Sequence, residues 1–184
     1  NAKRYIDGWS KSGAIVCSLQ KGQIIATKID GKYWMYWGDT DLFIATSDDC
    51  IRWTPVEDKK NNLVSVMKPR PGMFDSRLVE PGPFALTTND GILMIYNSAN
   101  SSSNGDKTLP GDAYTVGQAL FDKKNPQRML ARADKNFMVP EKPYEIGGQV
   151  NNVCFVEGMV YFDGRWLLYY GTADSRIAVA EVRR

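Results

Sequence analysis

The hydrophobic positions of this chain occur in short runs rich in Val, Ile, Tyr and Trp, separated by turn residues such as Asp-Gly and Pro-Gly. Runs of this kind are typical of β-strands. No segment keeps apolar residues at the i, i+3, i+4, i+7 spacing over three turns, as an amphipathic helix requires. The pattern predicts an all-β chain with strands at Ala14–Cys17, Gln23–Ile29, Tyr33–Trp37, Leu42–Ala45, Ile92–Tyr96, Ala113–Phe121, Val153–Val156, Met159–Phe162, Trp166–Tyr170 and Ile177–Val182.

A unit made of an Asp-Gly turn and an aromatic strand occurs three times along the chain. The copies begin at Asp30, Asp90 and Asp163, so successive copies start 60 and 73 residues apart. Repetition of this kind is typical of β-propeller blades. The chain would hold about three blades, whereas a propeller needs at least about four. We therefore expect part of the ring to be missing or supplied by another chain.

Composition adds exclusions to this picture. The 184 residues are 43% hydrophobic and 24% charged, with a net charge of +2, which gives no electrostatic case for nucleic acid or an anionic membrane. No run reaches the roughly 18 apolar residues of a membrane helix. The chain has no histidine, which excludes a Ser-His-Asp triad, a Cys-His dyad and a histidine metal site within it.

The termini, cysteines and one polar loop give further expectations. The start at Asn1–Arg4 lacks an initiator Met and a signal peptide, which indicates a cut end and leaves the compartment open, cytoplasmic or secreted. Cys17, Cys50 and Cys154 have apolar neighbours and are interpreted as buried small hydrophobes, with one disulfide left open. The segment Asn97–Asp112, rich in Ser, Asn and Gly, predicts a mobile surface loop.

Carboxylates and aromatic residues recur together near strand ends. This combination, without histidine, suits sugars, because rings stack on pyranose faces while carboxylates bind hydroxyls or move protons. Asp39, Asp41 and Asp174 could equally be turn formers. Glu80 stands out because its apolar, Pro-Gly-Pro surroundings should raise its pKa, as in a tuned general base, unless a structural ion pair with Arg70 or Arg77 explains it.

Several ordered segments resemble glycoside hydrolase family 130, the β-mannoside phosphorylases and β-mannosidases. The resemblance implies a five-bladed propeller, of which residues 1–184 would form a partial domain of roughly three blades. The general acid, an Asp in a Glu-Asp-Pro-Arg type segment, would lie upstream of this chain. The segments are Trp9–Ala14, Tyr33–Gly38 with Ala45–Asp49, Phe74–Pro83, Ala119–Asp122 with Asn125–Pro126, Pro140–Glu145 with Gly148–Val150, and Tyr169–Gly171 with Ala173–Asp174.

Departures from the family pattern favour hydrolysis over phosphorolysis. Phosphorylases of the family hold phosphate with Arg, Lys and His, and here Leu78 falls at the Lys position and Asn97 at the His position. A phosphate dianion would lose charge-assisted contacts there. The resemblance thus implies an inverting β-mannosidase with Glu80 as general base. Candidate substrate-binding residues are Trp37, Asp39, Arg70, Asp75, Arg77, Asn97, Glu145 and Asp174.

Two other functions stay open from the sequence. One is a β-mannoside phosphorylase that uses Arg70, Arg77 and Lys28 for phosphate. The other is a carbohydrate-binding propeller without activity, if the natural protein lacks the upstream acid. In each case the expected ligand is a mannose-containing oligosaccharide, with no cofactor and no metal, and homo-oligomer formation stays open.

Overall fold

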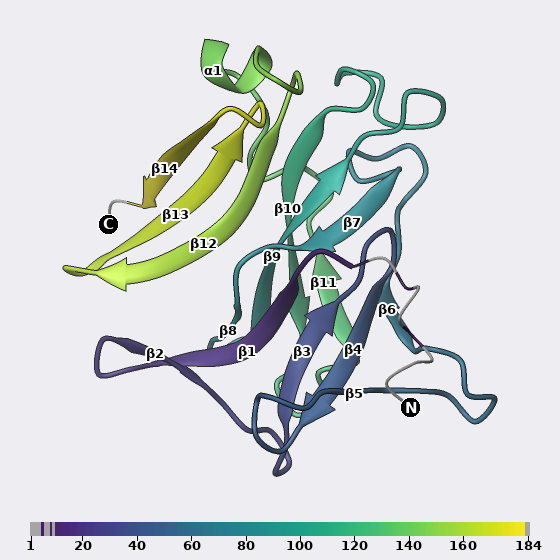
Figure 1. Cartoon of the computed structure of the whole chain (residues 1–184), viewed down its shortest axis with the longest axis vertical. Coiled ribbons are helices and arrows are strands. Elements are labelled where there is room, and N and C mark those ends of the chain that lie inside the picture. Colours follow the sequence, from purple (N-terminus) through teal and green to yellow (C-terminus); the bar gives the residue numbers. More distant parts are fainter. Residues whose placement is uncertain (1–4, 6–7, 9, 183–184) are drawn as a thin grey trace.

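The computed structural model describes Tyr5, Gly8 and residues 10–182, so Asn1–Arg4 and Trp9 lie outside the described residues. The described chain is all-β, as the hydrophobic pattern predicts, with one helix of a single turn, α1 (Pro143–Ile146) (Figure 1). Its strands are β1 (Gly13–Gln20), β2 (Gln23–Ala26), β3 (Tyr33–Trp37), β4 (Leu42–Ser47), β5 (Thr54–Pro55), β6 (Ser65–Met67), β7 (Leu78–Pro81), β8 (Ala85–Thr87), β9 (Ile92–Ala99), β10 (Tyr114–Phe121), β11 (Met129–Arg132), β12 (Cys154–Phe162), β13 (Arg165–Thr172) and β14 (Arg176–Val182).

These strands form two sheets. The larger has eleven strands along the path β11-β10-β9-β8-β1-β3-β4-β5, with β2, β6 and β7 paired beside it, and the smaller is β12-β13-β14. Strand β1 joins the two halves of the larger sheet, because it pairs with β3 near its start and with β2 and β8 further on. The larger sheet curls around its core, and β12–β14 stand beside β9 and β10 (Figure 1). This joining does not reproduce separate blades, so the five-bladed propeller stays a prediction.

The three Asp-Gly copies occupy matching places. Each forms the turn into the first strand of a hairpin: β3–β4, β9–β10 or β13–β14. At the first and third copies both turn residues have positive φ, 51° and 77° at Asp30 and Gly31, and 49° and 74° at Asp163 and Gly164. This is the tight turn whose twist matches that of paired strands. The sequence repeat is therefore a structural repeat.

Three local expectations differ from the structure. The predicted strands Val153–Val156 and Met159–Phe162 are not separate: from Cys154 on they form one strand, β12, with a bulge at Glu157 that interrupts the alternation. The predicted strand Gln23–Ile29 ends as β2 at Ala26. The expected loop at Asn97–Asp112 was wrong for its first residues, since β9 continues to Ala99 and the Asn100 side chain binds the carbonyls of residues 106, 109 and 110.

Two apolar clusters hold the sheets together. The first lies within the larger sheet and includes Tyr36 and Phe121. The second joins β9 and β10 to β12 and β13 through Val116, Val156 and Tyr170. All three cysteines are free; Cys17 and Cys154 are buried and Cys50 is half-buried. No helix in the described part of the chain is long and apolar enough to cross a membrane.

Candidate active site

Glu80 lies on β7, which is buried along its whole length. One edge of β7 pairs with β9, where Glu80 stands opposite Asn97. On the other edge, the Val79 N–H donates to the Thr40 carbonyl at 3.3 Å. The Glu80 side chain is only 1% exposed, so a strand fixed on both edges holds a carboxyl group away from bulk water.

Asp39 approaches Glu80 from the turn between β3 and β4. Within this turn Gly38 has φ 123° and Thr40 has φ 77°. A Cβ at Gly38 would stand 2.4 Å from the Asp41 carbonyl oxygen, so only glycine fits there. Positive φ is unfavourable for a β-branched residue such as Thr40, and strain of this kind clusters at functional sites. In this turn the Asp39 side chain is only 9% exposed and lies near Lys11.

Lys11 joins the two carboxyl groups. Its Nζ lies 3.0 Å from Glu80 Oε1 and 3.8 Å from Asp39 Oδ2. Among the described residues, Glu80 Oε2 is buried and has no N–H or O–H donor. The alternative that the sequence left open, an ion pair of Glu80 with Arg70 or Arg77, is not found among the described residues. Lys11 pairs with Glu80 from the segment before β1, and those two arginines bind other carboxylates.

Burial sets the proton affinity of Glu80. Burial is the largest cause that raises the Glu80 pKa, to about 7. The Asp39 carboxyl also raises this pKa, whereas the hydrogen bond and charge of Lys11 lower it. Partial burial would lower the pKa of Lys11, yet the hydrogen bond and charge of Glu80 outweigh burial and raise it. A carboxyl group that titrates near neutral pH can accept a proton at working pH, as a general base must.

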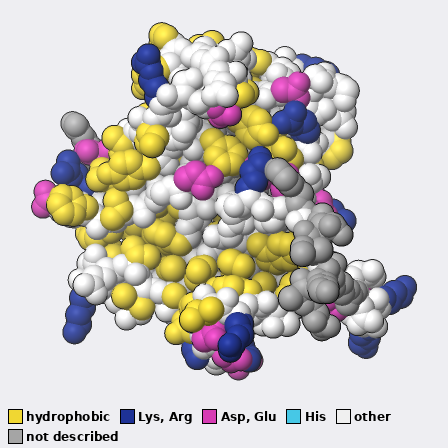
Figure 2. Space-filling view, viewed as in Figure 1, with side chains coloured by type: hydrophobic (Ala, Val, Ile, Leu, Met, Phe, Trp, Pro, Cys, Tyr) yellow, Lys and Arg dark blue, Asp and Glu magenta, His cyan; other side chains and the backbone are white. Residues whose placement is uncertain are grey.

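A cleft of about 290 Å³ adjoins this group through Lys11. The ring centroids of Phe155 and Tyr114 are 5.8 Å apart, and the Lys11 Nζ lies 5.9 Å from the Phe155 centroid. Arg77 is not one of the residues that line the cleft, but its Nη2 donates a hydrogen bond to the Tyr114 hydroxyl at 3.1 Å. On the face in Figure 2, charged side chains lie among hydrophobic ones. The cleft is lined by Lys11, Tyr114, Val150, Val153, Phe155 and Asp174.

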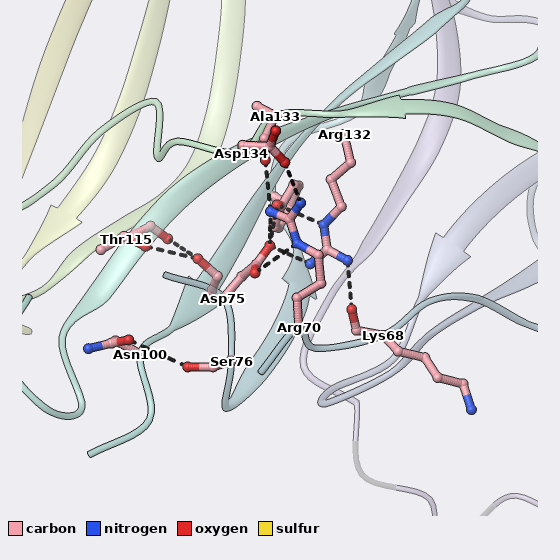
Figure 3. A network of polar contacts seen from close by, with 11 residues as sticks. Lys68, Arg70, Asp75, Ser76, Asn100, Thr115, Arg132, Ala133 and Asp134 are labelled. Carbon is pink, nitrogen blue, oxygen red and sulfur yellow. Dashed lines mark hydrogen bonds and ion pairs between the residues drawn. The ribbon is translucent and has the colours of Figure 1, made fainter. Parts of the chain in front are cut away.

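Arg70 and Asp75 lie in a separate, buried network (Figure 3). The Arg70 guanidinium donates to both Asp75 oxygens, at 3.1 and 2.9 Å, and Asp75 also accepts from Arg132 and from the Tyr96 hydroxyl. Asp75 is fully buried. Arg70 and Asp75 therefore have a structural role, since they bind each other and Asp75 also binds Tyr96 on β9 and Arg132 on β11. Neither residue lines the cleft.

Three other sequence candidates also lie outside the cleft. The Asn97 amide binds the carbonyl of Pro81 and both backbone groups of Val156. Glu145 accepts backbone N–H groups at the start of α1 and the Tyr170 hydroxyl. Trp37 lines a different hollow, of about 580 Å³, and none of the residues around that hollow lines the cleft beside Glu80.

The structure brings Glu80 and Asp39 together at Lys11, and Asp174 lines the cleft that Lys11 also lines. Arg77 lies next to this cleft through its hydrogen bond to the Tyr114 hydroxyl. Sequence reasoning missed Lys11, Tyr114 and Phe155. Lys11 lies within a segment that resembles family 130, between Ser10 and Ser12, and that placement was the available signal. The other two lie within the predicted strands Ala113–Phe121 and Val153–Val156, where only the fold shows which way their rings face.

An all-β chain with buried carboxyl groups beside an aromatic cleft is an arrangement suited to carbohydrate chemistry. The family model described as beta-1,4-mannooligosaccharide phosphorylase matches residues 4–184, and the chain belongs to glycoside hydrolase family 130. It is 32% identical over 181 residues to the 1,2-beta-oligomannan phosphorylase of Thermoanaerobacter sp. (strain X514), covering 97% of this chain and 55% of that protein.

Solved structures resemble it more closely. A glycosyl hydrolase from Bacteroides ovatus is 44% identical with a TM-score of 0.94, covering 97% of this chain and 50% of the other. The same figures hold for a structure described under the statement that the family of mannoside phosphorylases contains glycoside hydrolases that target beta-1,2 mannosidic linkages in Candida mannan. The chain therefore spans about half the length of the relatives it matches.

Proposed function

We propose that the full-length protein hydrolyses β-mannosides with inversion and that Glu80 is its general base. The observation that carries this proposal is Glu80 itself, a buried carboxyl group with one oxygen on Lys11 and the other without a donor group in the described part of the chain. Its pKa, raised to about 7, suits proton transfer from water near neutral pH. The substrate would be a mannose-containing oligosaccharide, as the names of the relatives suggest.

In this mechanism Glu80 removes one proton from a water molecule as the water oxygen bonds to the anomeric carbon. The bond from that carbon to the leaving oxygen breaks, and an acid from another part of the full-length protein protonates the leaving group. An inverting pair of carboxyl groups is about 6.5–9.5 Å apart, which leaves room for the water. The Phe155 ring would stack on a sugar face, and the Asp174 carboxylate would accept hydrogen bonds from sugar hydroxyl groups.

Phosphorolysis is the second candidate, because the family description and the Thermoanaerobacter relative are both named phosphorylases. The three cations considered for phosphate do not support it: Arg70 binds Asp75, Arg77 binds Asp112, and Lys28 lies over the Tyr33 ring. Leu78 is buried and apolar. Lys11 is the cation at the cleft, but Glu80 already holds it.

We also extend the proposal to the fold of the full-length protein, a five-bladed propeller. The repeated hairpins and the half-length match to relatives support it. So does an exposed apolar face of the smaller sheet, where Ile177 is 82% exposed, which a further blade would cover. That face carries Val160, Phe162, Tyr169, Ile177 and Val179.

Product analysis tests the function. The full-length protein is incubated with β-1,2- and β-1,4-mannobiose, with and without inorganic phosphate, and the products are separated. Hydrolysis predicts free mannose at a rate independent of phosphate. Mannose 1-phosphate that forms only with phosphate would support the second candidate instead.

A further inference from the structure

Lys11 is held in place by the two residues that flank it. The Gly38 N–H donates to Ser10 Oγ at 3.2 Å, and Ser12 Oγ donates to the Pro81 carbonyl at 3.0 Å. These bonds attach the segment to the β3–β4 turn and to β7, the elements that carry Asp39 and Glu80. The backbone therefore sets Lys11 between two carboxyl groups.

The two oxygens of the Glu80 carboxyl group have different surroundings. Oε1 accepts from Lys11 Nζ at 3.0 Å, while Oε2 is buried and has no N–H or O–H donor among the residues described. The neighbouring Asp39 carboxyl can share a proton with Glu80, and this hydrogen bond helps to raise the Glu80 pKa. A buried carboxylate oxygen without a donor is costly to keep. An incoming water molecule that donates to Oε2 would satisfy it. The Lys11 side chain is 45% exposed, so this cation also borders the cleft.

We infer that Lys11 is a positioning residue for the general base: it fixes Glu80 through Oε1 and leaves Oε2 to accept the proton of the attacking water. This inference rests on the proposed function. Lys11 also stabilises the ionised form of Glu80, which burial and Asp39 both oppose. The titratable groups facing Lys11 are Asp39, Glu80, Tyr114, Glu157 and Asp174.

The two neighbours of Glu80 should therefore shift its titration in opposite directions. An opposite charge within hydrogen-bonding distance lowers the pKa of a carboxyl group by about 1–3 units. Lys11→Met keeps the length of the side chain and removes its charge, so it should shift the acidic limb of the kcat/KM profile to higher pH by about 1 pH unit or more. Asp39→Asn removes a like charge, so it should shift the same limb to lower pH. A purely structural role for Lys11 would reduce activity without moving this limb.

The experiment measures kcat/KM for a β-mannobiose with the full-length protein between about pH 5 and pH 9. Lys11→Arg keeps the charge and should leave the limb near its wild-type position, even if Lys11→Met is too unstable to assay. Lys32→Met is the matched control, because Lys32 pairs only with the exposed Asp48 among the described residues and should leave the profile unchanged.

The outcomes separate this inference from the proposed function. A limb that stays in place in folded Lys11→Met, while Glu80→Gln is inactive, overturns the positioning role alone. A shift in Lys11→Arg as large as that expected for Lys11→Met also overturns it. Near wild-type turnover in Glu80→Gln would instead remove the proposed function.

Discussion

Replacing Asn97 tests whether this residue binds substrate or braces the fold. In the structure its amide Nδ2 donates to the carbonyls of Pro81 and Val156, at 3.3 and 2.9 Å, and its Oδ1 accepts the Val156 N–H at 2.7 Å. Asn97 is fully buried. These bonds connect β9 of the larger sheet to β12 of the smaller one, beside the strand that carries Glu80.

Asn97→Ala would leave both backbone groups of Val156 buried without this partner. Each such loss costs about 1–3 kcal/mol, so the free energy of unfolding should fall by about 2–6 kcal/mol. Urea unfolding of the full-length protein measures this loss as a lower midpoint with an unchanged slope. Asn104→Ala is the control, because the Asn104 side chain is exposed and should change stability by less than about 0.5 kcal/mol.

The refuting result is a variant as stable as the wild type whose KM for the mannoside rises. That outcome would place Asn97 in contact with substrate, as the sequence suggested. A less stable variant whose KM is unchanged at a temperature where it stays folded would support the brace.

Three further predictions follow from the same structure. Phe155→Leu should raise the KM for a mannoside about tenfold by removing the stacking ring, without moving the pH profile, whereas an unchanged KM would contradict a stacking role. Glu145→Gln should lower stability by about 1–2 kcal/mol, because Glu145 accepts two backbone N–H groups and a tyrosine hydroxyl. Burial alone would raise the pKa of Glu145, but those hydrogen bonds lower it, so the stabilisation is present above its unfolded pKa and should fade as pH falls through the folded one; a Gln variant equally stable at neutral pH would contradict this. The wild-type kcat/KM should rise with pH through an apparent pKa near 7, since Glu80 must be ionised to act, and a flat acidic side would contradict its role as base.

The all-β class and the hairpin turns could be read from the sequence, because their signals are local. Strand runs and Asp-Gly turns depend on neighbouring residues, and the turns at Asp30 and Asp163 form where the pattern placed them. Short strands such as β7 were missed, since Leu78–Pro81 has no alternation when every side chain is buried. The bulge at Glu157 was also missed, because one extra residue resembles the end of a strand.

The site was readable only in part. Glu80 could be singled out because its apolar neighbours are adjacent in sequence and already imply a raised pKa. Its partner could not, since Lys11 is 69 residues away and is brought close only by the pairing of β1, β3 and β7 with their neighbours. Arg70 and Asp75 looked like ligand-binding residues because charge alone does not reveal that two side chains bind each other.

The most direct test of the central claim is the rate of mannose release from a β-mannobiose in phosphate-free buffer by the full-length protein and its Glu80→Gln variant. The account predicts steady release by the wild type and a rate lower by about 10²–10⁴-fold in the variant, which keeps the shape of Glu80 but cannot accept the proton. Release by the folded variant at near wild-type rate, or no release by the wild type until phosphate is added, would contradict it.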